Sequence, residues 1–148
     1  MNTTPKITSI IIIFLLLCIS CKSQTIITKV SYISAGMGGY EIVQVTKDSV
    51  IGKIVNRRKK IFINEKTQKK FWNSLIQSMT VTEFQEVKPL KRVQDHDEEN
   101  TTIKIETTQG NYSLLNGDFD PIKNKKVLQF VEILQAELNR IYLEEKDK

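Results

Sequence analysis

The hydrophobic and polar positions of the chain first follow the pattern of β-strands. Three runs rich in β-branched and aromatic residues cover 25–33, 40–45 and 50–55, and they are separated by Gly36-Met37-Gly38-Gly39 and by Thr46-Lys47-Asp48-Ser49. Clusters of glycine, serine and aspartate of this kind mark connections between strands. We therefore predict three consecutive strands, with 61–63 either a short fourth strand or the lead-in to a helix.

The next segment changes to a helical period. Asn64 is a candidate N-cap, and Pro89 closes the region. The apolar residues between them lie on one face of a 3.6-residue period: Phe71, Trp72, Leu75, Ile76 and Met79. A charged run follows at 91–100, which predicts a solvated loop.

The second half of the chain repeats strands before a helix. Residues 101–107 alternate with Ile103 and Ile105 on one face, and a turn at 109–111 leads to a strand at 112–115. Asp120-Pro121 has the form of a helix start, an N-cap followed by proline at the first helical position. The apolar stripe of that helix comprises Val127, Val131, Leu134, Leu138 and Ile141.

The predicted order is β-β-β-(β)-α-β-β-α, which defines an α+β fold. Short turns between strands imply an antiparallel sheet of about five strands, and two amphipathic helices imply cover on one face. The order hints at a duplicated ββα unit, although no residue-level repeat supports one. We expect a single domain over 25–143 and a frayed tail over 144–148.

The first residues have a different character. Lys6 precedes an uninterrupted apolar run over 10–19, with no acidic residue in this part of the chain. A positive start and a short apolar run are typical of a secretory signal. The run is about half of the roughly 20 apolar residues that a membrane-spanning helix needs. We therefore predict a signal peptide over 1–20.

The end of this run carries a further motif. Ile19-Ser20-Cys21-Lys22 places a small residue directly before a cysteine, and it resembles the lipobox of bacterial lipoproteins, although Cys18 stands where that family usually has leucine. The junction is similar to that of small uncharacterised Bacteroidetes (flavobacterial) lipoproteins. The resemblance implies cleavage before Cys21, diacylglycerol and palmitate on Cys21, and a short tether over 21–24. It also implies a periplasm-facing outer-membrane location, because acidic residues that would direct the protein to the cell surface do not follow Cys21.

Three other interpretations of this segment stay open. An ordinary signal could be cleaved and leave Cys21 as a free thiol, or the run could remain as an uncleaved anchor. Cys18 and Cys21 also have the spacing of a redox or zinc pair. Because Cys18 lies inside the apolar run, its context argues against that pair.

Composition bounds the partners. Residues 1–20 contain one basic and no acidic residue, so the remaining 128 residues carry 21 basic against 17 acidic side chains, a net charge of +4. With lipid on Cys21 no cysteine is left for a disulfide, and stability must come from packing. The modest positive charge suits a membrane surface or an acidic partner, and nucleic acid is not an expected partner of an exported lipoprotein.

No catalytic constellation is visible, and we expect neither enzyme activity nor a cofactor. The single histidine, His96, lies between Asp95 and Asp97, and these three residues are the weak candidates for a metal site. They lack EF-hand spacing, and such a charged run is more typical of a hydrated loop. No Gly-x-Ser-x-Gly motif is present either.

Three surface segments are candidates for contacts. Gly36, Met37, Gly38 and Gly39 could in principle cradle a phosphate, but a strand rather than a helix follows them, which favours a hairpin that presents Met37. Arg57 and Arg58 lie in a basic turn that could touch lipid headgroups or an anionic polysaccharide. Asp48-Ser49-Val50 matches the Asp-Ser/Thr-apolar pattern of O-glycosylation in the Bacteroidetes, so Ser49 is a candidate glycosylation site.

Taken together, the sequence predicts a membrane-anchored, non-enzymatic binding or accessory protein whose partner is an envelope protein or glycan. One alternative is an inhibitor of an envelope-directed hydrolase, which would present a rigid loop at 36–39 or 91–100. Another is a small enzyme with an unrecognised site.

Overall fold

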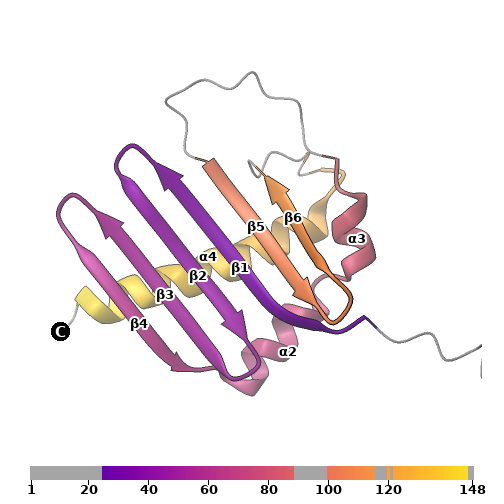
Figure 1. Ribbon diagram of the computed structural model, residues 1–148, viewed down its shortest axis with the longest axis horizontal. Coiled ribbons are helices and arrows are strands. Elements are labelled where there is room, and N and C mark those ends of the chain that lie inside the picture. Colours follow the sequence, from indigo (N-terminus) through magenta and orange to yellow (C-terminus); the bar gives the residue numbers. More distant parts are fainter. Residues whose placement is uncertain (1–24, 89–99, 116–119, 121, 147–148) are drawn as a thin grey trace, which may run out of the picture.

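The fold is built on an antiparallel sheet of six strands in the order β4-β3-β2-β1-β5-β6 (Figure 1). The structure is a computed structural model that describes residues 25–88, 100–115, 120 and 122–146. In chain order the strands and helices are β1 Ile27–Gly36, β2 Gly39–Thr46, β3 Ser49–Asn56, β4 Lys60–Lys66, α2 Lys69–Gln77, α3 Val81–Glu86, β5 Asn100–Thr107, β6 Asn111–Leu115 and α4 Lys125–Lys146.

The first four strands form a meander of tight hairpins. The register of β1 and β2 pairs Gly36 with Gly39, which leaves a two-residue turn at Met37 and Gly38. Gly39 has a φ of +145°, and a Cβ there would clash with the carbonyl oxygen of Val55 on β3. Only glycine fits this position, because L side chains rarely adopt such a φ. The predicted hairpin at 36–39 is confirmed.

β1 lies at the centre of the sheet because the chain returns to it after the helices. Its second neighbour is β5, which pairs with it from Ile27–Thr107 to Ala35–Asn100. β6 then closes that side of the sheet as the edge strand. The other edge is β4, which pairs only with β3 in the described part of the chain.

The helices cover one face of this sheet. α4 crosses behind the strands in the view of Figure 1. Side chains from both layers are almost completely buried where they meet, and they include Val30, Val43, Ile103, Ile105, Leu75, Phe130, Leu134 and Ile141. Burial of such a side chain contributes roughly 1.5–3 kcal/mol, so this layer is the main source of stability.

The predicted α+β class is confirmed, but the count of elements is corrected. The sequence predicted about five strands and two helices, whereas the described residues form six strands in one sheet and three helices that pack against it. Residues 60–66 form a full strand, β4, because Ile61 turns into the core while the whole run stays in register with β3. Asn64 therefore lies inside β4, and it is not a helix N-cap.

The helical period after β4 is divided between two short helices. α2 ends at Gln77, and α3 begins at Val81 after its N-cap Thr80. The hydroxyl of Thr80 accepts the N–H of Glu83, while the Glu83 carboxylate accepts the N–H of Thr80. This reciprocal pair is a capping box. With four strands before α2 and two before α4, the chain does not divide into two equal ββα units.

The last helix is close to its predicted position. Asp120 Oδ1 accepts the backbone N–H groups of Ile122 and Lys123 at 3.0 and 3.2 Å, and these bonds, led by that of Lys123, lower the pKa of Asp120. Asp120 thus caps a turn, and α4 itself begins at Lys125. The helix continues to Lys146, and the frayed tail over 144–148 stays a prediction. None of the helices in the described ranges is both long and apolar enough to cross a lipid bilayer.

Candidate functional site

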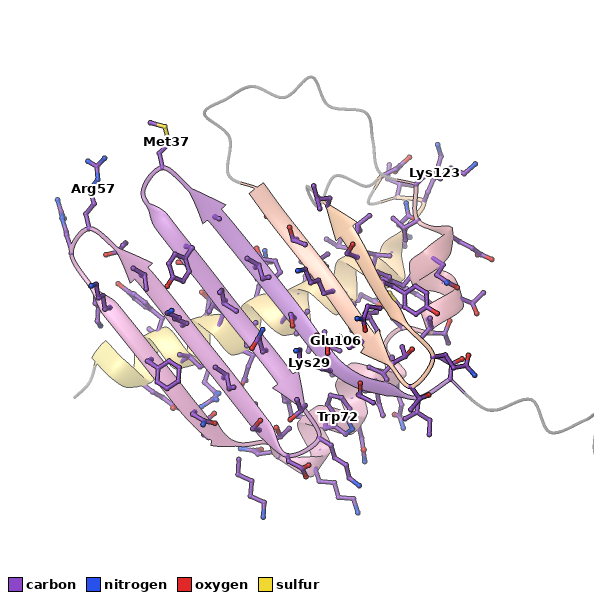
Figure 2. All side chains as sticks on the ribbon, in the orientation of Figure 1. Lys29, Met37, Arg57, Trp72, Glu106 and Lys123 are labelled. Carbon is purple, nitrogen blue, oxygen red and sulfur yellow. The ribbon has the colours of Figure 1, made fainter. Side chains whose placement is uncertain are left out.

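The face of the sheet opposite α4 is not covered by any described helix (Figure 1). We call the strand side chains that point away from α4 the open face, which is the face turned to the viewer in Figures 1 and 2. The strand register aligns one row of side chains across it: Phe62, Lys53, Ile42, Ile33, Thr102 and Leu115. Phe62 and Leu115 are 66% and 59% exposed.

The open face is also positively charged. Its strand positions carry the lysines Lys29, Lys53, Lys60, Lys66 and Lys104. The only acidic side chain at these positions is Glu106, which forms an ion pair with Lys29 at 2.6 Å (Figure 2). Lys53 Nζ lies 5.1 Å from the centroid of the Tyr40 ring, a cation–π contact. Exposed apolar side chains among an excess of lysines suit a partner that is both apolar and acidic.

Two of the predicted contact segments lie together at one end of the strands. Met37 at the β1–β2 turn is 77% exposed, and Arg57 and Arg58 occupy the β3–β4 turn beside it (Figure 2). Asn56 Oδ1 accepts the N–H groups of Arg58 and Lys59 at 3.0 and 2.8 Å, which fixes this turn. We call the two turns the hairpin tips. A depression of about 460 Å³ lies beside them, lined by residues 36–41 and 54–56.

A larger cavity lies at the other end of the strands, where the described chain begins. It measures about 850 Å³ and lies between the first residues of the domain, the β2–β3 turn and the helices α2 and α3. Its apolar lining includes Trp72, Ile76, Met79 and Tyr112. The sequence predicts Trp72, Ile76 and Met79 only as the apolar face of a helix. No local pattern shows that a cavity lies against them.

The chemistry that this cavity offers is limited. Among the described residues, Lys47 and Asp48 are its only charged lining side chains, and both belong to the exposed β2–β3 turn. General acid–base catalysis uses titratable groups held within hydrogen-bonding reach of a substrate. The described lining holds no histidine or second carboxylate that would complete such an arrangement.

The remaining predicted site residues are placed as follows. Ser49 is the first residue of β3 and is half-buried, and its hydroxyl lies 3.1 Å from that of Thr46. Cys21 and the three metal candidates Asp95, His96 and Asp97 lie outside the described residues. Over 25–88, 100–115 and 122–146, no three histidine, cysteine, aspartate or glutamate side chains gather in the way that a metal ion requires.

The strongest electrostatic effects lie among the helices, away from these surfaces. Arg140 on α4 pairs with Glu137, Glu144 and, across to β4, Glu65, and these hydrogen bonds, led by that of Glu137, raise the pKa of Arg140. Glu83 accepts hydrogen bonds from Lys126 and Thr80, which lower its pKa to about 2. Both groups join an element of the fold to α4, so we interpret them as structural.

The fold and its surfaces define a small α+β domain with one open sheet face. No protein-family model matches the chain, and a search of curated proteins finds no similar sequence.

Proposed function

We propose that this protein is a lipid-anchored protein of the cell envelope that binds an acidic protein through the open face of its sheet. The observation that carries the proposal is the open face itself, where one row across the six strands holds four apolar side chains on β4, β2, β1 and β6, and the face carries five lysines and a single glutamate. An apolar centre with a polar rim is the usual anatomy of a protein interface.

The size of the open face is consistent with such a role. Strands lie ~4.8 Å apart and rise ~3.3 Å per residue, so six strands of about eight residues present roughly 760 Å². A standard interface buries about 800 Å² on each partner. The open face alone is therefore about as large as one side of a standard interface, and the hairpin tips would add to the buried area if they take part.

The proposed anchor determines how this face is presented. Lipid on Cys21 would hold a membrane four residues from Thr25, within ~14 Å of fully extended chain. The hairpin tips lie at the opposite end of β1, ten residues and about 30 Å away (Figure 1). On a periplasm-facing outer-membrane leaflet, the tips would point into the periplasm and the open face to the side.

The partner is tested by capture from envelope extracts with the lipidated protein as bait. Phe62→Glu places a negative charge at the edge of the apolar row, where the side chain is 66% exposed and outside the core. We expect this variant to lose most of the captured partner, because it removes an apolar contact and repels an acidic surface. Partner levels are measured by quantitative mass spectrometry against wild-type bait.

Leu143→Glu is the matched control. Leu143 is 58% exposed on α4, so the change has the same chemistry on the other side of the molecule. The control should keep the partner at the wild-type level, and Lys53→Glu on the open face should lose it. Equal loss in Phe62→Glu and Leu143→Glu would refute the open face as the binding surface.

A second candidate function, inhibition of an envelope-directed hydrolase, is favoured by the hairpin tips. Met37 projects from a two-residue turn whose neighbours are fixed by the Gly36–Gly39 pairing, which gives the short, rigid loop that an inhibitor presents. Met37→Asp should then abolish inhibition of the captured hydrolase, whereas the Phe62→Glu variant should inhibit it as wild type does. Loss of inhibition in Phe62→Glu but not in Met37→Asp would instead support the open face as the functional surface.

A further inference from the structure

A group of lysines lies at the end of the domain where the described chain begins. We call Lys47, Lys66, Lys69 and Lys70 the tether-end lysines, and all four side chains are exposed. They belong to the β2–β3 turn, the end of β4 and the first turn of α2. Figure 1 shows these segments at the end of the sheet opposite the hairpin tips.

Hydrogen bonds hold these segments together. The N–H of Thr67, which lies between β4 and α2, donates to the carbonyl oxygen of Asp48 at 3.2 Å. Its hydroxyl donates to the carbonyl oxygen of Thr46 at 2.8 Å. The cavity lining places the β2–β3 turn beside Thr25 and Ile26 as well. The four lysines therefore form one fixed patch next to the first described residues.

Acidic side chains of the described residues do not pair with this patch. None of the four lysines forms an ion pair within the described ranges, and Asp48 is the only acidic residue of the β2–β3 turn. Lys69 and Lys70 also occupy the first turn of α2, which has no acidic residue and no side-chain cap. The helix dipole disfavours cations at this position. These two lysines are thus unfavourable for the helix itself.

The patch lies at the end of the domain nearest the proposed anchor, where an anionic membrane surface could offset the unfavourable placement of Lys69 and Lys70. If lipid on Cys21 anchors the protein, as proposed above, the membrane surface lies within the ~14 Å reach of a four-residue tether. Exposed charges interact over a Debye length of about 10 Å at 0.1 M salt. Ile26, 57% exposed beside the tether, adds an apolar group at the same end.

We propose that the tether-end lysines bind the anionic phospholipid headgroups of the membrane that holds Cys21. This inference rests on the proposed lipid anchor and adds a second contact to it. Together the two contacts fix the orientation of the domain, with the hairpin tips held away from the bilayer and the open face turned to the side. A tether alone would leave the domain free to rotate.

The orientation is measured on the full, processed lipoprotein in vesicles. With Cys21 blocked by lipid, a cysteine introduced by Met37→Cys at the exposed tip can be labelled with a fluorophore, and energy transfer to acceptor lipids then reports how near the tip comes to the membrane. We expect low transfer in phosphatidylcholine vesicles that contain phosphatidylglycerol. Transfer should be higher in pure phosphatidylcholine, and at 1 M salt, where the Debye length is ~3 Å.

Two variants with equal loss of charge locate the contact. Lys69→Gln/Lys70→Gln removes two charges from the patch and relieves the unfavourable helix start, so the protein should fold with an unchanged or higher Tm. A lysine near an anionic surface changes binding by about fivefold, so this variant should lower the ratio of docked to free domains by roughly 25-fold. Arg57→Gln/Arg58→Gln removes two charges from the hairpin tips and should match wild type.

The outcomes separate the anchor from the patch. Failure of the wild type to float with vesicles in a density gradient would overturn the anchor. Flotation together with equal energy transfer in both kinds of vesicle would overturn only the role of the patch. Higher transfer in the Arg57/Arg58 variant than in the Lys69/Lys70 variant would also overturn it. The inference is supported if the Lys69→Gln/Lys70→Gln variant shows the same high energy transfer in vesicles with phosphatidylglycerol that wild type shows in pure phosphatidylcholine.

Discussion

At the scale of single residues, a tight fit joins Gly52 of β3 to Ile141 of α4. A Cβ built on Gly52 would lie 2.5 Å from Cδ1 of Ile141, well inside van der Waals contact. Ile141 itself is completely buried. The missing side chain at Gly52 is thus what allows the last turns of α4 to approach the sheet closely.

Gly52→Ala should therefore destabilise the protein. Overpacking of a filled core typically costs 1–3 kcal/mol, so we expect the free energy of unfolding in urea to fall by about this amount. Gly38→Ala is the control, because a Cβ there meets no atom within 4 Å, and its effect should stay within about 0.5 kcal/mol. Adding Ile141→Val, which removes Cδ1, should recover part of the loss. Absence of any recovery would place the strain elsewhere.

The sequence could predict residues whose conformation is set locally, and it could not predict this contact. Met37 and Arg57 were placed on turns correctly, because glycine and short polar runs determine a turn within four residues. Gly52 and Ile141 are far apart in the chain, and nothing near either residue signals the other. The apolar row of the open face was missed for the same reason, since it exists only in the register of six strands.

At the scale of elements, α3 is a six-residue helix that depends on its ends. Its capping box joins Thr80 to Glu83, and Glu83 also pairs with Lys126 at the start of α4. A helix this short is marginal alone, so these contacts and the burial of Phe84 hold it in place. The Thr-x-x-Glu spacing is a recognisable N-terminus signature and could have been found in the sequence. The strand β4 could be predicted only as one of two alternatives, a short strand over 61–63 or the lead-in to a helix, because Asn64 imitates an N-cap.

Thr80→Ala should lower the free energy of unfolding by about 1 kcal/mol, the usual effect of losing a side-chain N-cap. The measurement is urea unfolding followed by circular dichroism. Thr82→Ala, an exposed change in the same helix that leaves the capping box intact, is the control and should have little effect. Equal losses in the two variants would contradict the capping role.

The same contacts predict a pH dependence. The pKa of Glu83 is about 2 in the folded protein and 4.5 as its ordinary value. Its carboxylate therefore favours the folded state fully above pH 4.5, and that contribution is lost as the pH falls from 4.5 towards 2. The difference in unfolding free energy between wild type and Glu83→Gln should shrink over this window. A difference that stays constant from pH 7 to pH 2 would show that the charge of Glu83 has no role.

At the scale of the whole molecule, the two ends of the sheet have different surroundings. The end that leads to the proposed anchor carries the larger cavity and lysines without an ion pair to any described residue, while the opposite end carries the hairpin tips. The open face runs between them. In an anchored protein, this arrangement presents the open face to the side and the hairpin tips away from the membrane, so that either surface can meet a partner.

The proposed orientation of the domain at a membrane depends most directly on lipid at Cys21. Cells are grown with a clickable palmitate analogue, and the purified wild-type protein and its Cys21→Ala variant are compared for incorporated label. Because Cys21 is the proposed acylated N-terminus, label should appear on the wild type and be absent from the variant. Label on both proteins, or on neither, would contradict the anchor from which the orientation of the domain follows.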